Sequence, residues 1–355
     1  MKLAMLCRWN TSCGVSLHAE LIGRQWVKEG HKLSIFAPEN IRPVAEDEDY
    51  VYRISSDKGK GGSKEEFFKS SPFVKTDYEV FVGQRIGWIP LKPLLKVFPK
   101  IKKKAPAVYV VHERETPKDP LFYEFEWEAI VCFDERYKAQ WVKKFSPSLI
   151  HIIPYPTGYL RPGNKQKARE ELGLPLNERL IFSYGWAPQL HIFPIIPALE
   201  ELYKSYQFKF LVLADPKHTE AETESLKRYE FVQLQYEAPT RDEIYTYLHA
   251  SDACLMHKEK DEIRPGEAAV PSAILMCLGA LTPVITSDTD FIWFLDKAVM
   301  KYANKDELVK LLIKTFEGDK IVDDTLKGTK EYVTATSPEK VAGEFIKLFN
   351  QLRER

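Results

Sequence analysis

Ionisable side chains follow an apolar run at residues 108–115. Val108–Val111 is typical of a buried strand, and His112, Glu113 and Arg114 come directly after it. Ligands of open α/β sheets bind beyond the carboxyl ends of the strands, so a histidine here is placed to hydrogen-bond a substrate hydroxyl or to stabilise a transition state. A lone histidine is about as often structural, and both interpretations of His112 stay open.

A glycine opens the first expected helix. Arg8–Gly14 forms the loop after the first apolar run, and a helix-period segment begins at Gly14. A glycine there lets a substrate approach the backbone and the free N–H groups of a helix start, although an ordinary tight turn would have the same sequence. His18 lies inside this helix, which favours packing over catalysis.

A second helix start carries hydroxyl and charged groups nearby. Pro271 and Ser272 precede an apolar segment, and such a start can cap the helix or bind a diphosphate through uncovered N–H groups. The loop before it concentrates charge at Lys258, Lys260, Arg264 and Glu267. Arg264 could grip a phosphate with its planar guanidinium, whereas a solvated loop is the plainer interpretation.

The elements that position these residues alternate between strands and helices. Short apolar runs such as Leu3–Cys7, Lys32–Phe36 and Ala107–Val111 are separated by segments of helical period, and this alternation predicts parallel strands with crossover helices. A proline- and glycine-rich stretch at Pro154–Gly163 interrupts the pattern, which starts again at Leu180–Tyr184. We therefore predict an α/β protein with two doubly wound, Rossmann-like domains facing across a cleft.

The expected boundaries follow from the linker and from a last amphipathic stretch. Residues 1–154 form the first domain and residues 155–336 the second. In residues 337–355, Val341, Phe345, Leu348 and Leu352 recur at helical spacing, so this C-terminal helix should pack an apolar stripe, with the domain junction as one place for it.

Composition excludes several classes of protein. The 51 basic and 51 acidic side chains cancel, so no overall field draws in nucleic acid. Five scattered cysteines fit reduced thiols in a cytoplasmic protein better than a disulfide framework. No apolar stretch approaches the ~20 residues of a membrane span, and the N-terminus is not typical of a secretory signal. Asp288 and Asp290 are expected to cap a loop, and no metal site is expected.

Residues along the whole chain resemble a known family, the retaining GT-B glycosyltransferases of family four. The segments that carry the resemblance, each weak alone but specific in their order, are Cys13–Ala19, Gly30–Pro38, the strand ending on His112, Ile152–Gly158, Arg169–Pro175, Leu180–Gly185, Ala250–Leu255, Val270–Gly279 and Pro283–Asp288. The resemblance implies a hexosyltransferase that moves a sugar, with retention and without a metal, from a nucleotide-diphospho-sugar to an acceptor. The donor would be a substrate held by the second domain, the acceptor would bind the first, and no cofactor is implied.

The resemblance also implies roles for particular residues. His112 would touch the donor sugar, Gly14 would lie near the diphosphate or the acceptor, and Ser272 would cap the phosphate-binding helix. The full set of candidates is His112 and Glu267 for catalysis; Gly14, Gly185, Trp186, His191, Arg264, Ser272 and Ala273 for the donor phosphates; Tyr236 and Ile274 for the nucleoside; and Asn10, Ser12, His18 and Glu113 for the acceptor.

The chain departs from the family pattern at the donor site. Trp186 stands where the family has an arginine, and His191 stands at about the place of a family lysine. The family also has a pair of spaced glutamates. Glu267 takes the place of the first, and Ile274 stands near the place of the second. These changes motivate an alternative, a catalytically silent GT-B-like protein that binds a sugar nucleotide or a partner. A sugar-nucleotide epimerase is a third and weaker hypothesis.

A lysine-rich segment at residues 86–104 offers a possible membrane contact. It mixes apolar residues with lysines in the domain expected to bind the acceptor, which would suit a peripheral contact with anionic lipid. The interpretation that we favour is a crossover helix with a solvated lysine face.

Overall fold

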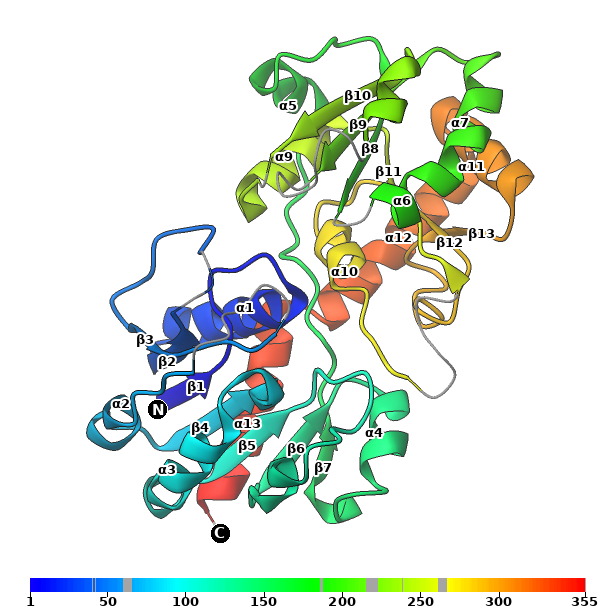
Figure 1. Ribbon diagram of the computed structural model, residues 1–355. Coiled ribbons are helices and arrows are strands. Elements are labelled where there is room, and N and C mark those ends of the chain that lie inside the picture. Colours follow the sequence, from blue (N-terminus) through cyan, green and yellow to red (C-terminus); the bar gives the residue numbers. More distant parts are fainter. Residues whose placement is uncertain are drawn as a thin grey trace. The chain divides into compact units, whose positions relative to one another are not determined.

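The computed structural model describes residues 1–39, 41, 43–59, 66–185, 188–214, 223–237, 239–260 and 267–354. The chain forms two compact units. Unit 1 comprises Met1–Pro156, Pro265–Val270 and Pro338–Arg355, and unit 2 comprises Thr157–Arg264 and Pro271–Ser337. Each unit is built on its own parallel sheet (Figure 1).

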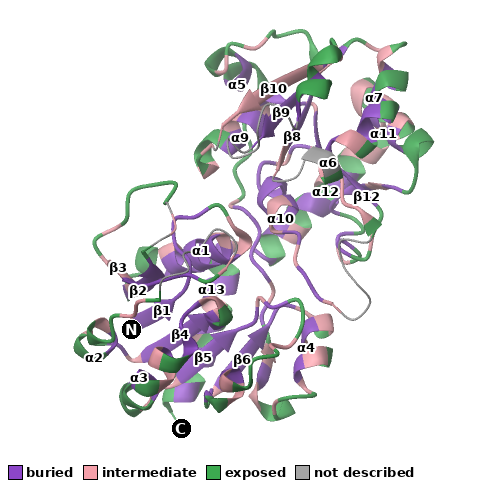
Figure 2. Ribbon diagram, viewed as in Figure 1, coloured by how far each residue is buried: buried purple, intermediate pink, exposed green. Residues whose placement is uncertain are grey.

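The sheet of unit 1 has the strand order β3-β2-β1-β4-β5-β6-β7 within the described residues, and every neighbouring pair is parallel. Its strands are β1 (Lys2–Leu6), β2 (Lys32–Pro38), β3 (Val51–Ser55), β4 (Val80–Gln84), β5 (Ala107–Val110), β6 (Ala129–Cys132) and β7 (Ile150–Ile152). The central strands are buried (Figure 2), as expected for a parallel sheet covered on both faces. The strand order reverses between β1 and β4.

The sheet of unit 2 has the order β10-β9-β8-β11-β12-β13 in the part of the chain that is described, again with parallel neighbours. Its strands are β8 (Arg179–Gly185), β9 (Phe208–Ala214), β10 (Val232–Tyr236), β11 (Ala253–Met256), β12 (Val284–Ser287) and β13 (Met300–Tyr302). The order reverses between β8 and β11. The two sheets confirm the predicted pair of doubly wound, Rossmann-like domains.

Helices connect the strands of both units. Among the residues that the structure describes, the α-helices are α1 (Gly14–Lys28), α2 (Ser71–Lys75), α3 (Leu91–Lys104), α4 (Glu135–Trp141), α5 (Lys165–Glu171), α6 (Pro188–His191), α7 (Ile196–Tyr203), α9 (Arg241–Ala250), α10 (Ser272–Leu278), α11 (Lys305–Glu317), α12 (Lys320–Ala335) and α13 (Pro338–Arg353). The 3-10 helices are η1 (Ile86–Trp88), η2 (Pro120–Glu124), η3 (Pro147–Leu149), η4 (Phe193–Ile195) and η5 (Glu224–Arg228).

The C-terminal helix α13 packs in unit 1. Its apolar residues Val341, Phe345, Leu348 and Leu352 are buried. Trp26 of α1 donates a hydrogen bond from Nε1 to the carbonyl of Ala342 at 3.2 Å, and its ring lies 5.9 Å from that of Phe345. Helix α13 therefore packs against α1 and completes the apolar core of unit 1 there.

Two edge strands, β3 and β13, lie outside the elements expected from the sequence. Each ends its sheet, and β3 is exposed or half-buried over its first three residues. An edge strand that is exposed in part lacks the continuous apolar run by which a central parallel strand is recognised.

Candidate functional site

The carboxyl edge of the first sheet gathers the candidate residues of unit 1. Strands β1, β4 and β5 are neighbours; Asn10 and His112 lie in the loops after β1 and β5, and Gln84 is the last residue of β4. The reversal of strand order between β1 and β4 is the position where open α/β sheets form their ligand sites. The fold thus brings to one edge of the sheet residues that are far apart in sequence, with 74 positions from Asn10 to Gln84 and 28 from Gln84 to His112.

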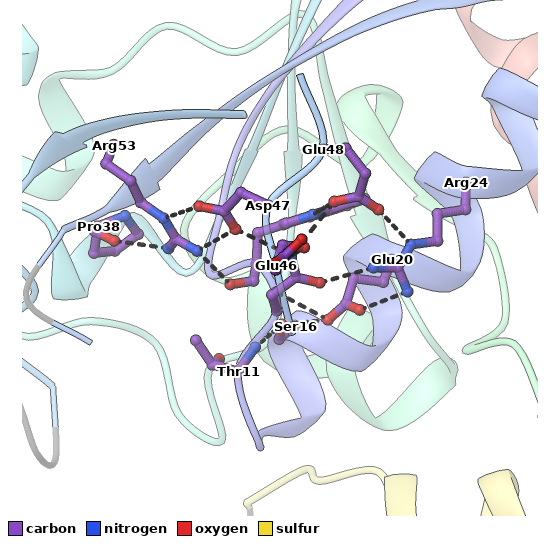
Figure 3. Close-up of polar contacts among 11 residues, drawn as sticks. Thr11, Ser16, Glu20, Arg24, Pro38, Glu46, Asp47, Glu48 and Arg53 are labelled. Carbon is purple, nitrogen blue, oxygen red and sulfur yellow. Dashed lines mark hydrogen bonds and ion pairs between the residues drawn. The ribbon is translucent and has the colours of Figure 1, made fainter. Parts of the chain in front are cut away.

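Asn10 has a left-handed backbone with φ of 53° and is almost completely buried. Its side-chain Nδ2 donates to the carbonyl of Glu46 and to Asp47, both at 3.0 Å, and its Oδ1 accepts from Arg24 at 2.7 Å. The surrounding ion pairs join Arg24 to Glu20 and Glu48 (Figure 3). The structure gives Asn10 the role of shaping the loop, because its amide is used within the protein.

The other candidates of this loop lie at the start of α1. Ser12 is exposed, and Gly14 is the first residue of the helix. The hydroxyl of Tyr155 donates to the carbonyl of Gly14 at 2.6 Å, while the sulfur of Cys13 accepts from the N–H of Ser16 at 3.4 Å. Ser12 is therefore the exposed side chain of this loop.

His112 lies against a second histidine and a glutamine. Its Nε2 is 2.8 Å from Oε1 of Gln84, and Nδ1 of His18 is 3.0 Å from the same oxygen. The backbone around it is held by Arg85, which donates to the carbonyl of His112 at 2.8 Å, and by Glu113, which accepts from its N–H at 3.1 Å. Burial, reinforced by His18 and Arg85, holds the pKa of His112 well below its usual range, so the ring is neutral at pH 7.

Glu113 and His18 face the interior of unit 1. The Glu113 carboxylate accepts from the hydroxyl of Tyr109 at 2.6 Å and is almost completely buried. His18 has no exposed surface and is surrounded by the rings of Phe133, Tyr155 and Phe345, whose centroids lie 5.1, 5.2 and 5.9 Å away. Both residues are packed inside unit 1 next to His112 and help to hold its loop in place.

Burial lowers the pKa of His18 to about 3, and this predicts a loss of stability in acid. The unfolded chain binds a proton near pH 6.5 while the native ring does not, so stability is complete above pH 6.5 and falls as the pH drops. Between pH 7.5 and pH 5 the loss from His18 should be about 2 kcal/mol.

The urea midpoint of tryptophan fluorescence at these two pH values measures this effect. The variant His18→Gln cannot titrate, so its midpoint should change less between pH 7.5 and pH 5 than that of the wild type. Equal changes in the two proteins would contradict the prediction.

Glu267 lies next to the loop after β5, although it is far from that loop in sequence. The N–H of Ala268 donates to the carbonyl of Arg114 at 2.9 Å, and the Glu267 carboxylate lies 3.8 Å from the Arg114 guanidinium. The side chain of Glu267 is only 9% exposed, while that of Arg114 is half exposed. The two candidate catalytic residues, His112 and Glu267, therefore belong to one region of unit 1.

In unit 2, Gly185 and His191 meet at the reversal of strand order. Gly185 ends β8, and a Cβ on it would lie 3.5 Å from Nδ1 of His191 at the end of α6. Lys258, two residues after β11, places its Nζ 3.1 Å from Nε2 of the same imidazole. An ammonium group thus lies next to His191, which in turn lies next to Gly185. Trp186 and Arg264 lie outside the described residues.

The structure corrects the capping role of Ser272. Pro271 occupies the N-cap position of α10 with φ of −76° and ψ of 67°, and no side chain caps this end. The first backbone bond of the helix runs from the N–H of Leu275 to the carbonyl of Pro271 at 3.0 Å. Ser272 is the first helical residue, so its hydroxyl lies one position beyond the place where a side chain caps a helix.

Ala273, Ile274 and Tyr236 have different surroundings. The carbonyl of Ala273 accepts from the hydroxyl of Tyr184 at 3.3 Å. Ile274 is completely buried among the core residues of α10, so its side chain offers no surface to a nucleoside. Tyr236 ends β10, and its hydroxyl pairs with that of Thr223.

Two residues of this arrangement were not among the candidates from sequence. Gln84 ends a buried strand, and its position after an apolar run is the one signal that marks it. Lys258 follows a buried strand in the same way, but the sequence places it among several charged residues of one loop. Their contacts with His112 and His191 depend on the order of the strands.

The apolar side chains of residues 86–104 are mostly buried. Leu91, Leu94, Val97, Phe98 and Ile101 of α3 face the core. The exposed residues of the helix include Lys92, Lys96, Lys100 and Lys103. Within the described residues, no helix combines the length and apolar character needed to cross a bilayer.

No known family's sequence profile matches the chain. Its structure is similar along its whole length to solved glycosyltransferases. A glycosyltransferase from Rickettsia africae superimposes with a TM-score of 0.71 at 13% identity, covering 99% of this chain and 98% of that one. HepE from Anabaena, solved in complex with UDP-glucose, gives a TM-score of 0.70 at 12% identity over 99% and 100% of the two chains.

The sucrose-phosphate synthase of Thermosynechococcus elongatus gives a TM-score of 0.66 at 12% identity, over 99% of this chain and 98% of that one. Together with the two doubly wound sheets, these likenesses define the class of protein. The chain has the GT-B fold.

Proposed function

We propose that the protein is a glycosyltransferase that transfers a sugar from a nucleotide-diphospho-sugar to an acceptor. The observation that carries the proposal is the cation at the reversal point of the second sheet, where Lys258 contacts His191 beside Gly185. A phosphate-binding site needs fixed positive charge and an accessible backbone, and this corner supplies the Lys258 ammonium group and a glycine, which has no side chain to cover its backbone. The resemblance to family four adds an expectation of retention without a metal.

The residues of unit 1 suit the other half of the reaction. A neutral His112 can hydrogen-bond a sugar hydroxyl, and the carboxylate of Glu267 can stabilise positive charge that develops at the anomeric carbon. The exposed Ser12 and the start of α1 at Gly14 are the proposed acceptor contacts. In this proposal the donor is a substrate, and the protein needs no further cofactor.

A thermal-shift screen tests the donor. Purified protein is heated with UDP-, GDP- or ADP-sugars, each with and without magnesium. Because UDP-glucose is bound in a solved GT-B neighbour, UDP-sugars come first. A ligand that binds the folded state at 100 times its Kd adds about 2.7 kcal/mol, which should raise Tm by about 5 to 10 °C.

The outcomes separate the candidate functions. A metal-independent shift with one base supports the donor site and selects the donor for transfer assays, in which the anomeric configuration of the product reports retention. Conversion of the sugar nucleotide without any acceptor would indicate an epimerase. No shift with any nucleotide would favour a silent GT-B-like protein that binds a partner.

Peripheral membrane contact is a separate proposal and depends on charge alone. Lys92, Lys96 and Lys100 are exposed at four-residue spacing on α3, whereas the apolar side chains of the helix face the core. Flotation with liposomes containing anionic lipid should show binding at low salt that is lost at about 0.5 M salt, because salt screens the attraction between the lysines and the anionic lipid. No flotation at low salt would remove the proposal.

A further inference from the structure

Gln84 lies between the two histidines of unit 1 and contacts both with one atom. Its Oε1 is 3.0 Å from Nδ1 of His18 and 2.8 Å from Nε2 of His112. The glutamine is 1% exposed, at the end of β4. An amide oxygen has two lone pairs, so it can accept one hydrogen bond from each imidazole.

The rest of the surroundings determine which way the amide points. The Nε2 of Gln84 lies 3.0 Å from the sulfur of Met5, which accepts weakly and cannot donate. If the amide were reversed, its oxygen would face this sulfur without a donor. The observed orientation leaves the oxygen to the two histidines and satisfies the buried amide at both ends.

His18 provides an independent check on the proton positions. Its Nε2 is buried and has no hydrogen-bond partner among the described residues. A buried N–H without an acceptor is costly, so the proton of this neutral ring belongs on Nδ1, where Gln84 accepts it. The same oxygen then takes the Nε2 proton of His112.

We infer that Gln84 is a positioning residue that holds His112 in the tautomer protonated on Nε2, with Nδ1 left as the hydrogen-bond acceptor for a ligand. Within the described part of the chain, Nδ1 of His112 has no partner, and it is not among the fully buried polar atoms. The tautomer therefore selects the class of ligand group: a hydroxyl, which donates a proton, rather than a phosphate oxygen or carboxylate.

The charged groups around His112 agree with a neutral ring. His18 faces it from α1, Arg85 contacts its carbonyl from the end of β4, and Glu113 accepts its backbone N–H. Tyr155 contacts the ring of His18. Burial lowers the pKa of both histidines, which keeps each ring with one proton at neutral pH.

Imidazole nitrogen NMR of the full-length protein tests the inference without substrate. The inference rests on the proposed function for its ligand, a sugar hydroxyl, but the tautomer is measured on the protein alone, so a failure to find transfer would leave the result standing. The 15N-histidine-labelled protein has 8 histidines, and the spectrum of His112→Gln identifies the signals of interest. We expect His112 to show a protonated Nε2 and an unprotonated Nδ1 from pH 6 to pH 8.

Two variants complete the test. Gln84→Glu keeps an acceptor but adds a negative charge, so the titration midpoint of His112 should move to higher pH. Met5→Leu removes the sulfur but leaves His18, whose Nδ1 proton still requires the glutamine oxygen, so the tautomer should not change. A proton on Nδ1 in the wild type would overturn the inference even if a variant failed to fold, and so would an unchanged midpoint in folded Gln84→Glu.

Discussion

Replacing Glu267 with glutamine should lower kcat/KM for sugar transfer by about 100-fold or more, while the affinity for the donor changes little. The carboxylate is only 9% exposed and lies in the region of His112, where a fixed negative charge can stabilise the positive charge of the transition state. The glutamine keeps the size and loses the charge. Steady-state kinetics with the donor found by thermal shift, together with the donor Kd, measure both quantities.

Arg114→Ala is the control for this prediction. Arg114 forms an ion pair with Glu267, at 3.8 Å, and its side chain is half exposed. If Glu267 served only to pair with Arg114, both variants would lose activity equally. We expect Arg114→Ala to lose less than tenfold. Transfer by Glu267→Gln within threefold of the wild type would remove Glu267 from the catalytic residues.

Replacing Lys258 with alanine should weaken donor binding by about 10- to 150-fold, which corresponds to the loss of one charge-assisted hydrogen bond of about 1.5–3 kcal/mol. Lys258 brings its ammonium group to His191 at the point where the second sheet reverses its strand order. The effect should appear mainly in the Kd of the nucleotide-sugar, measured by calorimetry, because the proposed function places this cation at the phosphates rather than at the reacting carbon.

Lys260→Ala provides a matched control, since it removes the same charge from an exposed position two residues away. Its donor Kd should stay within about threefold of the wild type, because an exposed charge in water contributes little. If both variants weaken binding to the same extent, the effect is a general one of charge, and Lys258 has no special place at the phosphates.

The fold class could be predicted from the sequence because it depends on local patterns. Runs such as Lys32–Phe36 and Ala107–Val111 are short, apolar and separated by helical segments, and a proline-rich stretch marks where the pattern restarts. The alternation of strands and helices allows few topologies. The edge strands β3 and β13 lie outside that prediction because β3 is partly exposed and β13 has only three residues, so neither has the apolar run of a central strand.

The candidate residues show the limit of local patterns more clearly. His112 could be selected because it follows a buried strand, and strand ends carry ligand sites in this kind of sheet. Asn10 follows a strand too, yet its amide is used within the loop by Arg24 and Asp47. Ser272 precedes an apolar run like a cap, but Pro271 takes that position in α10. Sequence position alone does not say which polar atoms are already satisfied.

The class of fold, the two-domain organisation and the strand ends where chemistry is expected could all be predicted, since each follows from residues close together in the chain. Three sets of contacts could be found only in the folded protein: Gln84 with His18 and His112, Glu267 with Arg114, and Lys258 with His191. The contacts of Gln84 with His112 and of Lys258 with His191 follow from strand order, because a parallel sheet places side by side strand ends that are far apart in sequence. The contacts of His18 and Glu267 depend on how α1 and the segment at residues 267–270 pack in unit 1.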